Sequence, residues 1–411
     1  IRDCDVCLVG SEMCIRDRGR TDVRLKDMPF KTLLHTGTAN SLTWLKIEYT
    51  ENKMMKKILV TSAGGAPSAN FIRSLRAAQE EFHIVGVDAN KYTIQRSEAD
   101  KNYLVPYAKD PDYLPVLLQI IEAEEVEFLH CQMNGEMLTV SAIRDQIGVK
   151  TLLPSRHAIE VLEDKYKSYL CWQKAGLPVP ETLMLNDEQD LVEAFDRFGP
   201  RIWVRATQGA AGKGSLPTDD FDTAVRWINF MNGWGHFTAA ECLEPQTITW
   251  QSIWKDGELV VAQGRKRLYW EFADRAPSGV TGVTGTGVTI NDPSLDELAI
   301  GSVLAVEEQP NGIYGVDMTY DANGNPHLTE INVGRFFTTH YFFTAAGLNM
   351  PYIYVKLAYG EDPPLPVRKL NPLEPGLAWV RGMDCHPVLT TVEKIDQDEQ
   401  AFKNRLATLK K

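Results

Sequence analysis

The chain lacks any long apolar segment. Hydrophobic residues make up 44% of its 411 residues, yet no uninterrupted apolar run approaches the roughly 20 residues that a helix needs to cross a bilayer. The first residues also lack the sustained apolar core of a secretory signal. We therefore expect no membrane partner and a cytoplasmic location.

The chain is also short of positive charge and of paired cysteines. Lysine and arginine total 43 against 55 acidic residues, a formal net charge of −12. Nucleic-acid binding calls for basic surface, so we expect no nucleic-acid partner, although a local cationic pocket for a nucleotide is compatible with this balance. The seven cysteines are odd in number and scattered, which favours reduced thiols over a disulfide frame.

Two familiar nucleotide-binding motifs are missing as well. The glycine pair Gly64-Gly65 is followed by Ala-Pro-Ser, so the dinucleotide motif GxGxxG is absent and we do not expect NAD. The later glycine loop is not a Walker A loop, because Thr207 stands where its first glycine belongs. Gly64, Gly65 and Ser68 then form either a tight turn or part of a substrate site at the end of a strand.

The order of secondary-structure patterns predicts two or three domains, at about 150 residues each. Residues 1–52 show no convincing period, resemble a translated adaptor-like segment and are treated as an unassigned, possibly non-native extension. From Lys56 to about residue 150, buried-strand runs alternate with helices, which predicts a parallel α/β sheet. Later segments mix helices with antiparallel strands, and the glycine and threonine run at 277–290 predicts a long functional or disordered loop.

The most informative stretch is residues 315–335, GVDMTYDANGNPHLTEINVGR. Asn323-Gly324 predicts a tight hairpin turn between two strands. Glu330 and Asn332 are two residues apart and therefore share a face, which Asp317 of the first strand can join. Two carboxylates and an amide oxygen suit Mg²⁺ completed by substrate phosphates. The alternative is an ordinary acidic hairpin with a solvated face.

A second group of residues suits a phosphate-rich ligand. A strand at residues 202–206 runs into a loop whose glycines allow close backbone approach, and their N–H groups can cradle phosphate. Alternation places Arg265 and Arg267 on one face of a later strand. The alternative for the glycine loop is a flexible loop, and that for Arg265 and Arg267 is a solvated basic strand end. Lys165, taken alone, is more simply a solvated lysine on a helix.

The order and spacing of these features resemble the ATP-grasp superfamily, most nearly the carbamoyl-phosphate-synthase-like ligases. The specific part is ExNxxR, which runs from Glu330 to Arg335 and follows an aspartate on a strand. The resemblance implies a Rossmann-like pre-ATP-grasp α/β domain followed by a two-lobed ATP-grasp domain of α+β type. The implied boundaries are 53–150, then 151–360 with a lid lobe at about 181–240 and a metal-bearing lobe at about 241–360, and a C-terminal segment at 361–411.

The resemblance also implies roles for single residues. Asp317, Glu330 and Asn332 would hold Mg²⁺ or Mn²⁺, Arg265 would face the γ-phosphate or acyl-phosphate, and Arg335 the substrate carboxylate. Arg205 stands where the family usually has a lysine, and Thr247 stands near the family's ribose-binding glutamate. The implied ATP-binding residues are Lys165, Arg205, Gly209, Gly212, Lys213, Gly214, Glu241, Cys242, Leu243 and Thr247.

The implied reaction is the ligation of a small-molecule carboxylate to an amine, driven by ATP through an acyl-phosphate. Positioning and charge neutralisation carry such chemistry, which fits a chain without a Ser-His-Asp or Cys-His arrangement. Two alternatives stay open, an ATP-binding regulatory or sensing protein without turnover and an ATP-grasp kinase. The family also makes a homodimer plausible.

Overall fold

The computed structural model describes residues 55–409 except 210, 211, 213, 385 and 387, together with short strands before residue 55. The chain divides into two units, residues 1–54 and 55–411. Strands of the first unit pair in two small antiparallel groups, β1–β3 (Cys4–Val9, Glu12–Asp17, Val23–Arg24) and β4–β5 (Leu34–Thr36, Thr43–Leu45). The fold that follows is that of the second unit.

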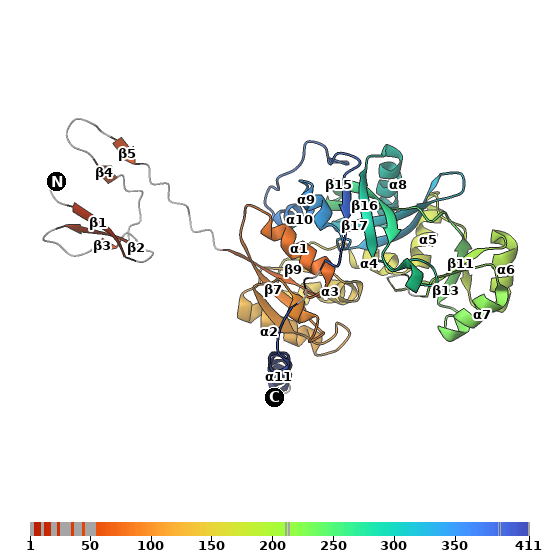
Figure 1. The fold of residues 1–411 in the computed structure, drawn as a ribbon, viewed down its shortest axis with the longest axis horizontal. Coiled ribbons are helices and arrows are strands. Elements are labelled where there is room, and N and C mark those ends of the chain that lie inside the picture. Colours follow the sequence, from red (N-terminus) through yellow and green to blue (C-terminus); the bar gives the residue numbers. More distant parts are fainter. Residues whose placement is uncertain are drawn as a thin grey trace. The chain divides into compact units, whose positions relative to one another are not determined.

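The second unit begins with the predicted parallel α/β domain, drawn in orange in Figure 1. Its sheet has the order β8-β7-β6-β9, and all neighbouring strands are parallel. Strand β6 ends in the apolar run Ile58, Leu59 and Val60, which is fully buried, as expected where helices cover both faces of such a sheet. The strands are β6 (Lys56–Val60), β7 (Phe82–Asp88), β8 (Lys101–Leu104) and β9 (Phe128–His130), and the helices are α1 (Ala66–Arg76), α2 (Tyr113–Glu124) and α3 (Asn134–Ile147), with the short helix η2 (Ile94–Arg96).

Helices α4 (Arg156–Leu162) and α5 (Lys165–Lys174) lead into a small lobe, which keeps here the name of the predicted lid lobe. The lobe has an antiparallel sheet, β10-β13-β11-β12, and Figure 1 shows α6 and α7 packed beside it. Aspartates cap both helices with side-chain oxygens that accept backbone N–H groups, which fixes where each helix begins. The elements are β10 (Thr182–Leu185), α6 (Glu188–Phe198), β11 (Ile202–Ala206), β12 (Leu216–Thr218), α7 (Phe221–Phe230) and β13 (Phe237–Glu241).

The remaining lobe is built on a larger antiparallel sheet with the order β18-β17-β14-β15-β16-β19. Its edge strand β19 (Ala378–Val380) comes from the C-terminal segment. The other elements are β14 (Thr247–Lys255), β15 (Glu258–Trp270), η3 (Ala273–Arg275), β16 (Thr284–Ile290), α8 (Pro293–Leu304), β17 (Gly312–Tyr320), β18 (Pro326–Val333), α9 (Tyr341–Ala345) and α10 (Met350–Ala358).

Strand β16 corrects one sequence-based expectation. The prediction of a loop through residues 277–290 is wrong for its second half, because Thr284–Ile290 pairs with β15 and β19. The glycines that suggest a loop instead make room within the sheet. A Cβ added at Gly285 would lie 2.1 Å from the Tyr269 ring, and one at Gly287 would lie 3.3 Å from Nη1 of Arg265.

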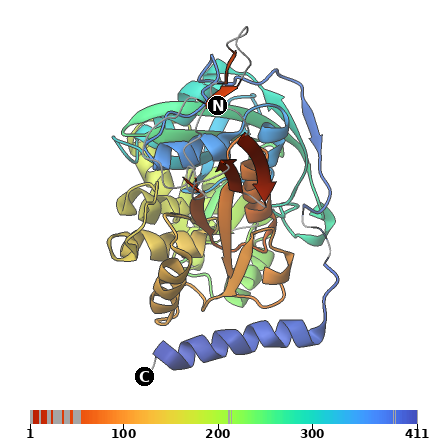
Figure 2. The ribbon, with the colours of Figure 1, turned by 90° about the vertical axis from the view of Figure 1, so that its left-hand side faces the viewer.

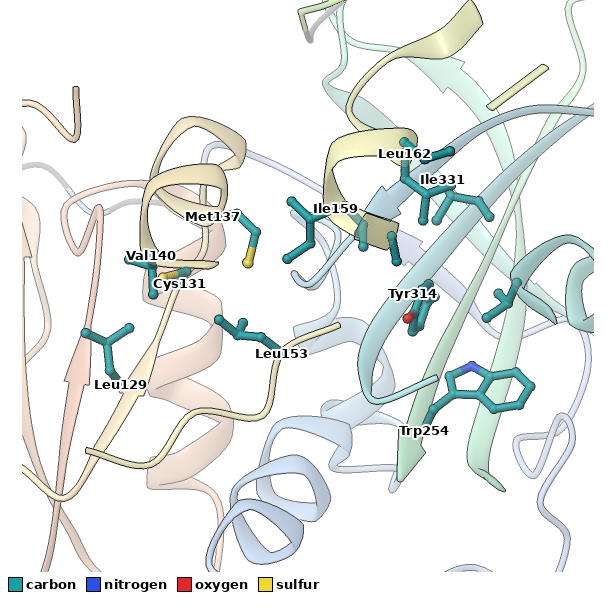
Figure 3. Close-up of a cluster of buried hydrophobic side chains, with 14 of the residues drawn as sticks. Leu129, Cys131, Met137, Val140, Leu153, Ile159, Leu162, Trp254, Tyr314 and Ile331 are labelled. Atoms are coloured by element: carbon teal, nitrogen blue, oxygen red, sulfur yellow. The ribbon is translucent and has the colours of Figure 1, made fainter. Parts of the chain in front are cut away.

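One hydrophobic core joins the first domain to the larger lobe. Figure 3 shows Leu129 and Met137 of the first domain in the same cluster as Trp254, Tyr314 and Ile331 of the larger lobe. Each such buried side chain contributes about 1.5–3 kcal/mol, and close packing across the junction makes it rigid. The edge of the parallel sheet therefore keeps a fixed position relative to strands β14–β18.

The C-terminal helix α11 (Val392–Leu409) packs against β8 and α2 of the first domain. Lys91 and Glu399 form an ion pair at 2.6 Å, and Phe402 packs against a small apolar cluster of that domain. Figure 2 shows this helix as the last element of the chain. None of the helices in the described part of the chain is long and apolar enough to cross a membrane.

Candidate active site

The structure brings Asp317, Glu330 and Asn332 together on the β17–β18 hairpin. Asp317 pairs with Glu330, and a bulge follows between Asp317 and Met318. Nδ2 of Asn332 donates to Oδ2 of Asp317 at 2.9 Å, and Oγ1 of Thr249 donates to Oδ1 at 2.6 Å. The three predicted oxygen-bearing side chains thus form one polar cluster.

The electrostatics of this cluster fit a divalent cation. Burial raises the pKa of Asp317, and the neighbouring Glu330 raises it further, while Arg267 and Thr249 lower it. Two adjacent carboxylates out of water are costly when both are ionised, and a bound cation would remove that cost. The described residues contain no group of three or more His, Cys, Asp or Glu suited to a metal. Two carboxylates and an amide suit Mg²⁺, because proteins usually supply only a few of its ligands and water and phosphates supply the rest.

Lys165 lies beside this cluster at the first position of α5. Asp164 caps the helix by accepting N–H groups from the residues that follow, which fixes the lysine at the helix start. Its Nζ donates to the carbonyl of Gly209 at 2.7 Å and lies 3.6 Å from Oε2 of Glu330. The side chain is only 12% exposed, so Lys165 is not a solvated helix lysine.

The glycine loop needs its glycines for backbone reasons. Gly209, Gly212 and Gly214 have φ values of 116°, 67° and 84°, a region that other residues rarely adopt. A Cβ at Gly212 would lie 2.2 Å from the carbonyl oxygen of Val280, so the loop touches a second glycine-rich loop. Lys213, the fourth predicted residue here, lies outside the described residues.

Arg205 joins the lid lobe to the β17–β18 hairpin. It lies on β11, and both Nη1 and Nη2 are 3.3 Å from the carbonyl oxygen of Thr329, the residue before Glu330. Its Nε is buried with no hydrogen-bond partner among the described residues. Burial lowers the pKa of Arg205, and the Glu330 carboxylate opposes that shift. The guanidinium therefore bridges the two lobes beside the carboxylates.

The predicted adenine-binding residues lie where β13 leaves the lid sheet. The backbone N–H of Glu241 donates to the carbonyl of Glu181 at 3.1 Å, and its carboxylate accepts the N–H of Glu181 at 2.9 Å. Cys242 is half-buried, and burial raises the pKa of its thiol. Glu241 thus pins the connection between lobes, while the backbone of Leu243 carries no hydrogen bond within the described chain. Thr247 accepts a hydrogen bond from Arg267.

Arg265 and Arg335 differ sharply in their surroundings. Arg265 is 3% exposed and lies 4.1 Å above the ring of Phe337, and its Nε and Nη1 have no hydrogen-bond partner among the described residues. Arg335 is held by two amides, donating from Nε to Asn134 and from Nη2 to Asn332. Arg265 is therefore the guanidinium whose donors are free to meet an anion.

Sequence reasoning missed Glu163 and Asn134 of this site, and it named Arg267 without its contacts. Burial raises the pKa of Glu163, a carboxylate that hydrogen-bonds to Asn134 and is within electrostatic reach of Arg335 and Lys165. Arg267 donates to Thr284 at 3.0 Å and to Thr249 at 3.4 Å. Glu163 directly precedes the Asp164-Lys165 pair, which is the one local signal available. Asn134 joins the site by accepting a hydrogen bond from Arg335, which lies 201 residues away in the sequence.

Parts of the chain are similar to known proteins. Residues 58–152 match the family described as "PylC-like, N-terminal domain". The carbamoyl phosphate synthase large chain of Methanosphaerula palustris is 31% identical over 157 residues, which are 36% of this chain and 14% of that relative. The biotin carboxylase domain of Hydrogenobacter thermophilus 2-oxoglutarate carboxylase superposes with a TM-score of 0.60 at 17% identity, covering 79% of this chain and 74% of that chain. The carboxyaminoimidazole ribonucleotide synthase of Aspergillus clavatus gives 0.59 at 15% identity, covering 79% and 80%.

These matches confirm the predicted fold class and the resemblance to ATP-grasp ligases of the carbamoyl-phosphate-synthase type. The names of the relatives agree with the predicted enzyme class. The chain spans 14% of the length of the carbamoyl phosphate synthase chain that it matches.

Proposed function

We propose that the protein is an ATP-dependent carboxylate–amine ligase that activates its acid substrate as an acyl-phosphate. The observation that carries this proposal is the partly buried cluster of Asp317, Glu330 and Asn332, flanked by Lys165 on one side and Arg265 on the other. Such a site can neutralise a triphosphate and orient an acid against its last phosphoryl group.

The nucleotide would lie between the two lobes. Lys165, Arg205 and the glycine loop would contact its phosphates, and the connection at Glu241, Cys242 and Leu243 would meet the adenine. The related structures support a nucleotide, since the carboxylase domain was solved with MgADP and bicarbonate and the synthase with ATP. Asp317, Glu330 and Asn332 would hold Mg²⁺ or Mn²⁺, which when bound supplies charge neutralisation for the phosphates.

The chemistry asks for positioning rather than a protein nucleophile. An oxygen of the substrate carboxylate attacks the γ-phosphorus of ATP, the bond from that phosphorus to the bridging oxygen breaks, and ADP leaves. An amine then attacks the acyl carbon, inorganic phosphate leaves with the C–O bond electrons, and the amine loses a proton. Arg265 would bind the acyl-phosphate oxygens, because its buried donors gain most from a charged partner.

Arg335 has a different part in this proposal. The two amides that hold it also fix Asn332, so the arginine orients the metal-binding residue. The resemblance assigns Arg335 to the substrate carboxylate, and it would reach that group with the donors that the two amides leave over. Thr247 would act through Arg267 rather than through a ribose. Small-molecule acids and amines are the expected partners, with a homodimer and a cytoplasmic location carried over from the family.

The proposal is tested by measuring ADP and phosphate formation against a panel of amino acids and small carboxylates, with and without amines. We expect product formation that needs both an acid and an amine, and a loss of about 100-fold or more in Glu330→Gln, since metal-site charge is removed. The matched control is Glu308→Gln, an exposed glutamate outside the site.

Three outcomes would overturn the proposal. Turnover in Glu330→Gln equal to that of the wild type removes the metal assignment. Tight MgADP binding with no turnover for any acid favours a sensing protein, and phosphoryl transfer that never needs an amine favours a kinase.

A further inference from the structure

The C-terminal segment places an arginine beside the proposed acid-binding region. Trp379 of β19 pairs with Gly287 of β16, and the chain continues along β16 so that the N–H of Arg381 donates to Gly285 at 3.0 Å. Nη1 of Arg381 then donates to the carbonyl of Thr284 at 3.2 Å. A segment beyond the ATP-grasp domain thus reaches back onto the sheet that carries Arg265.

Arg381 is oriented by a buried acid. Its Nε donates to Oδ2 of Asp384 at 2.6 Å, and the two side chains are 6% and 9% exposed. Asn70 of α1 donates to the same carboxylate at 3.2 Å and to the carbonyl of Thr338 at 2.7 Å. Arg381 therefore lies where the first domain, strand β16 and the residues after Arg335 meet.

Arg265 lies on the same face of the sheet. Its Nη1 would be 3.3 Å from a Cβ at Gly287, the residue that Trp379 faces across the β16–β19 pair. Burial lowers the pKa of Arg265, and the like charges of Arg267 and Arg381 lower it further. The guanidinium groups of Arg265 and Arg381 therefore lie within electrostatic reach of each other.

The local charges do not balance. Asp384 neutralises Arg381, and Asp317 is the acid that favours charge on Arg265 and Arg267. Arg265 keeps two buried donors without a hydrogen-bond partner among the described residues. A buried cation with unmet donors is costly on its own and is stabilised when an anion binds.

We propose that Arg381 is a specificity-determining residue that, together with Arg265, binds an anionic group of the acid substrate, a carboxylate or a phosphate. The C-terminal segment would then supply one wall of the acid-binding pocket, with the Asn70–Asp384 contact holding that wall in place. This deepens the proposed function and rests on it, because it concerns the acid that ATP activates.

The competing explanation is structural, in which the Arg381–Asp384 pair only fastens the C-terminal segment to α1. The two explanations differ in what anion binding does when the arginine changes. A structural pair affects the melting temperature and leaves anion affinity unchanged in any variant that folds. A binding residue changes anion affinity at unchanged nucleotide affinity.

The experiment is isothermal titration calorimetry on the full chain, saturated with MgADP, using succinate in one arm and inorganic phosphate in the other. We expect Arg381→Gln to weaken binding of the preferred anion by about tenfold or more, the loss of one charge-assisted contact. Arg381→Lys should recover part of the affinity, because it keeps the charge but not the planar fork. The control Arg368→Gln removes an exposed arginine of the same segment and should change nothing.

Each result decides the matter. Binding of succinate alone identifies a carboxylate group, and binding of phosphate alone identifies a phosphate group. If Arg381→Gln does not fold, Arg381→Lys keeps the ion pair and carries the comparison. Equal anion affinity in wild type and Arg381→Lys or Arg381→Gln, or no binding of either anion while MgADP binds, overturns this inference alone. Failure of MgADP to bind the wild type overturns the proposed function as well.

Discussion

Replacing Gly64 by alanine should destabilise the protein more than replacing its neighbour Gly65. A Cβ at Gly64 would lie 1.8 Å from the carbonyl oxygen of Thr93 and 2.9 Å from the backbone nitrogen of Ile94. A Cβ at Gly65 would meet its nearest atom, the carbonyl oxygen of Ser62, at 3.3 Å. The two glycines are adjacent in sequence, but only one has another backbone segment in the place of its missing side chain.

The expected size of the effect follows from what the new methyl group would displace. Inserting a carbon into a packed region usually costs about 1–3 kcal/mol, and backbone gives way less readily than a side chain. The opposing turn is also anchored, because Oγ1 of Thr93 donates to Asp88 at 2.9 Å and Ile94 is 3% exposed. We therefore expect a loss of about 3 kcal/mol for Gly64→Ala, the upper end of that range.

Gly65→Ala should stay within about 1 kcal/mol of the wild type. Gly65 precedes α1 with φ −86°, a conformation open to alanine. Its weaker cap is offset by the lower entropy of the unfolded chain. Thermal unfolding measures both variants, and about 3 kcal/mol corresponds to a melting point lower by about 3–5 °C in a chain of this size. Equal melting points for Gly64→Ala and the wild type would refute the packing argument.

Two further predictions use charged residues. Burial raises the pKa of Glu136 to about 7, although hydrogen bonds from the Thr61 and Ser62 hydroxyls lower it. The protonated side chain therefore stabilises the fold at low pH, and this contribution is lost as the pH rises through about 7. Because Glu136 is only partly buried, we expect its replacement by glutamine to remove about 1 kcal/mol of pH dependence from the free energy of unfolding between pH 5 and 8. Identical unfolding curves of the wild type at pH 5 and pH 8 would contradict this. Arg205→Lys should weaken MgADP binding by about tenfold, since a lysine cannot donate twice to Thr329. Wild-type affinity by calorimetry would show that the contact between the lobes does not contribute to nucleotide binding.

Local sequence patterns sufficed for the hairpin at residues 315–335. A turn signal and side-chain alternation place Glu330 and Asn332 on one face whatever the rest of the chain does, and the structure shows Asp317 joining them. The parallel sheet was recovered from a different pattern, the alternation of strand runs with helices. The bulge after Asp317 left no signal in the sequence.

Glycine was the residue that local reasoning judged least well. In residues 284–290 glycine and threonine indicate a loop, yet the segment is a central strand whose glycines make room for Tyr269 and Arg265. At Gly64 the sequence left a turn and a substrate contact open, and the missing side chain in fact accommodates the backbone of Thr93. In both cases glycine is needed because of a contact with a segment that comes close only after folding.

Two donors of Arg265 have no hydrogen-bond partner among the described residues, and this could not be predicted because it depends on the contacts of every neighbouring residue. Arg267 is satisfied by threonine hydroxyls and Asp317, and Arg335 by two amides. Arg265 lies over the ring of Phe337, and its Nε and Nη1 have no hydrogen-bond partner among the described residues. A folded chain tolerates that cost when a ligand repays it. The least satisfied cation in this site therefore marks where the acid substrate should bind, and Arg335, the arginine of the sequence motif, orients Asn332.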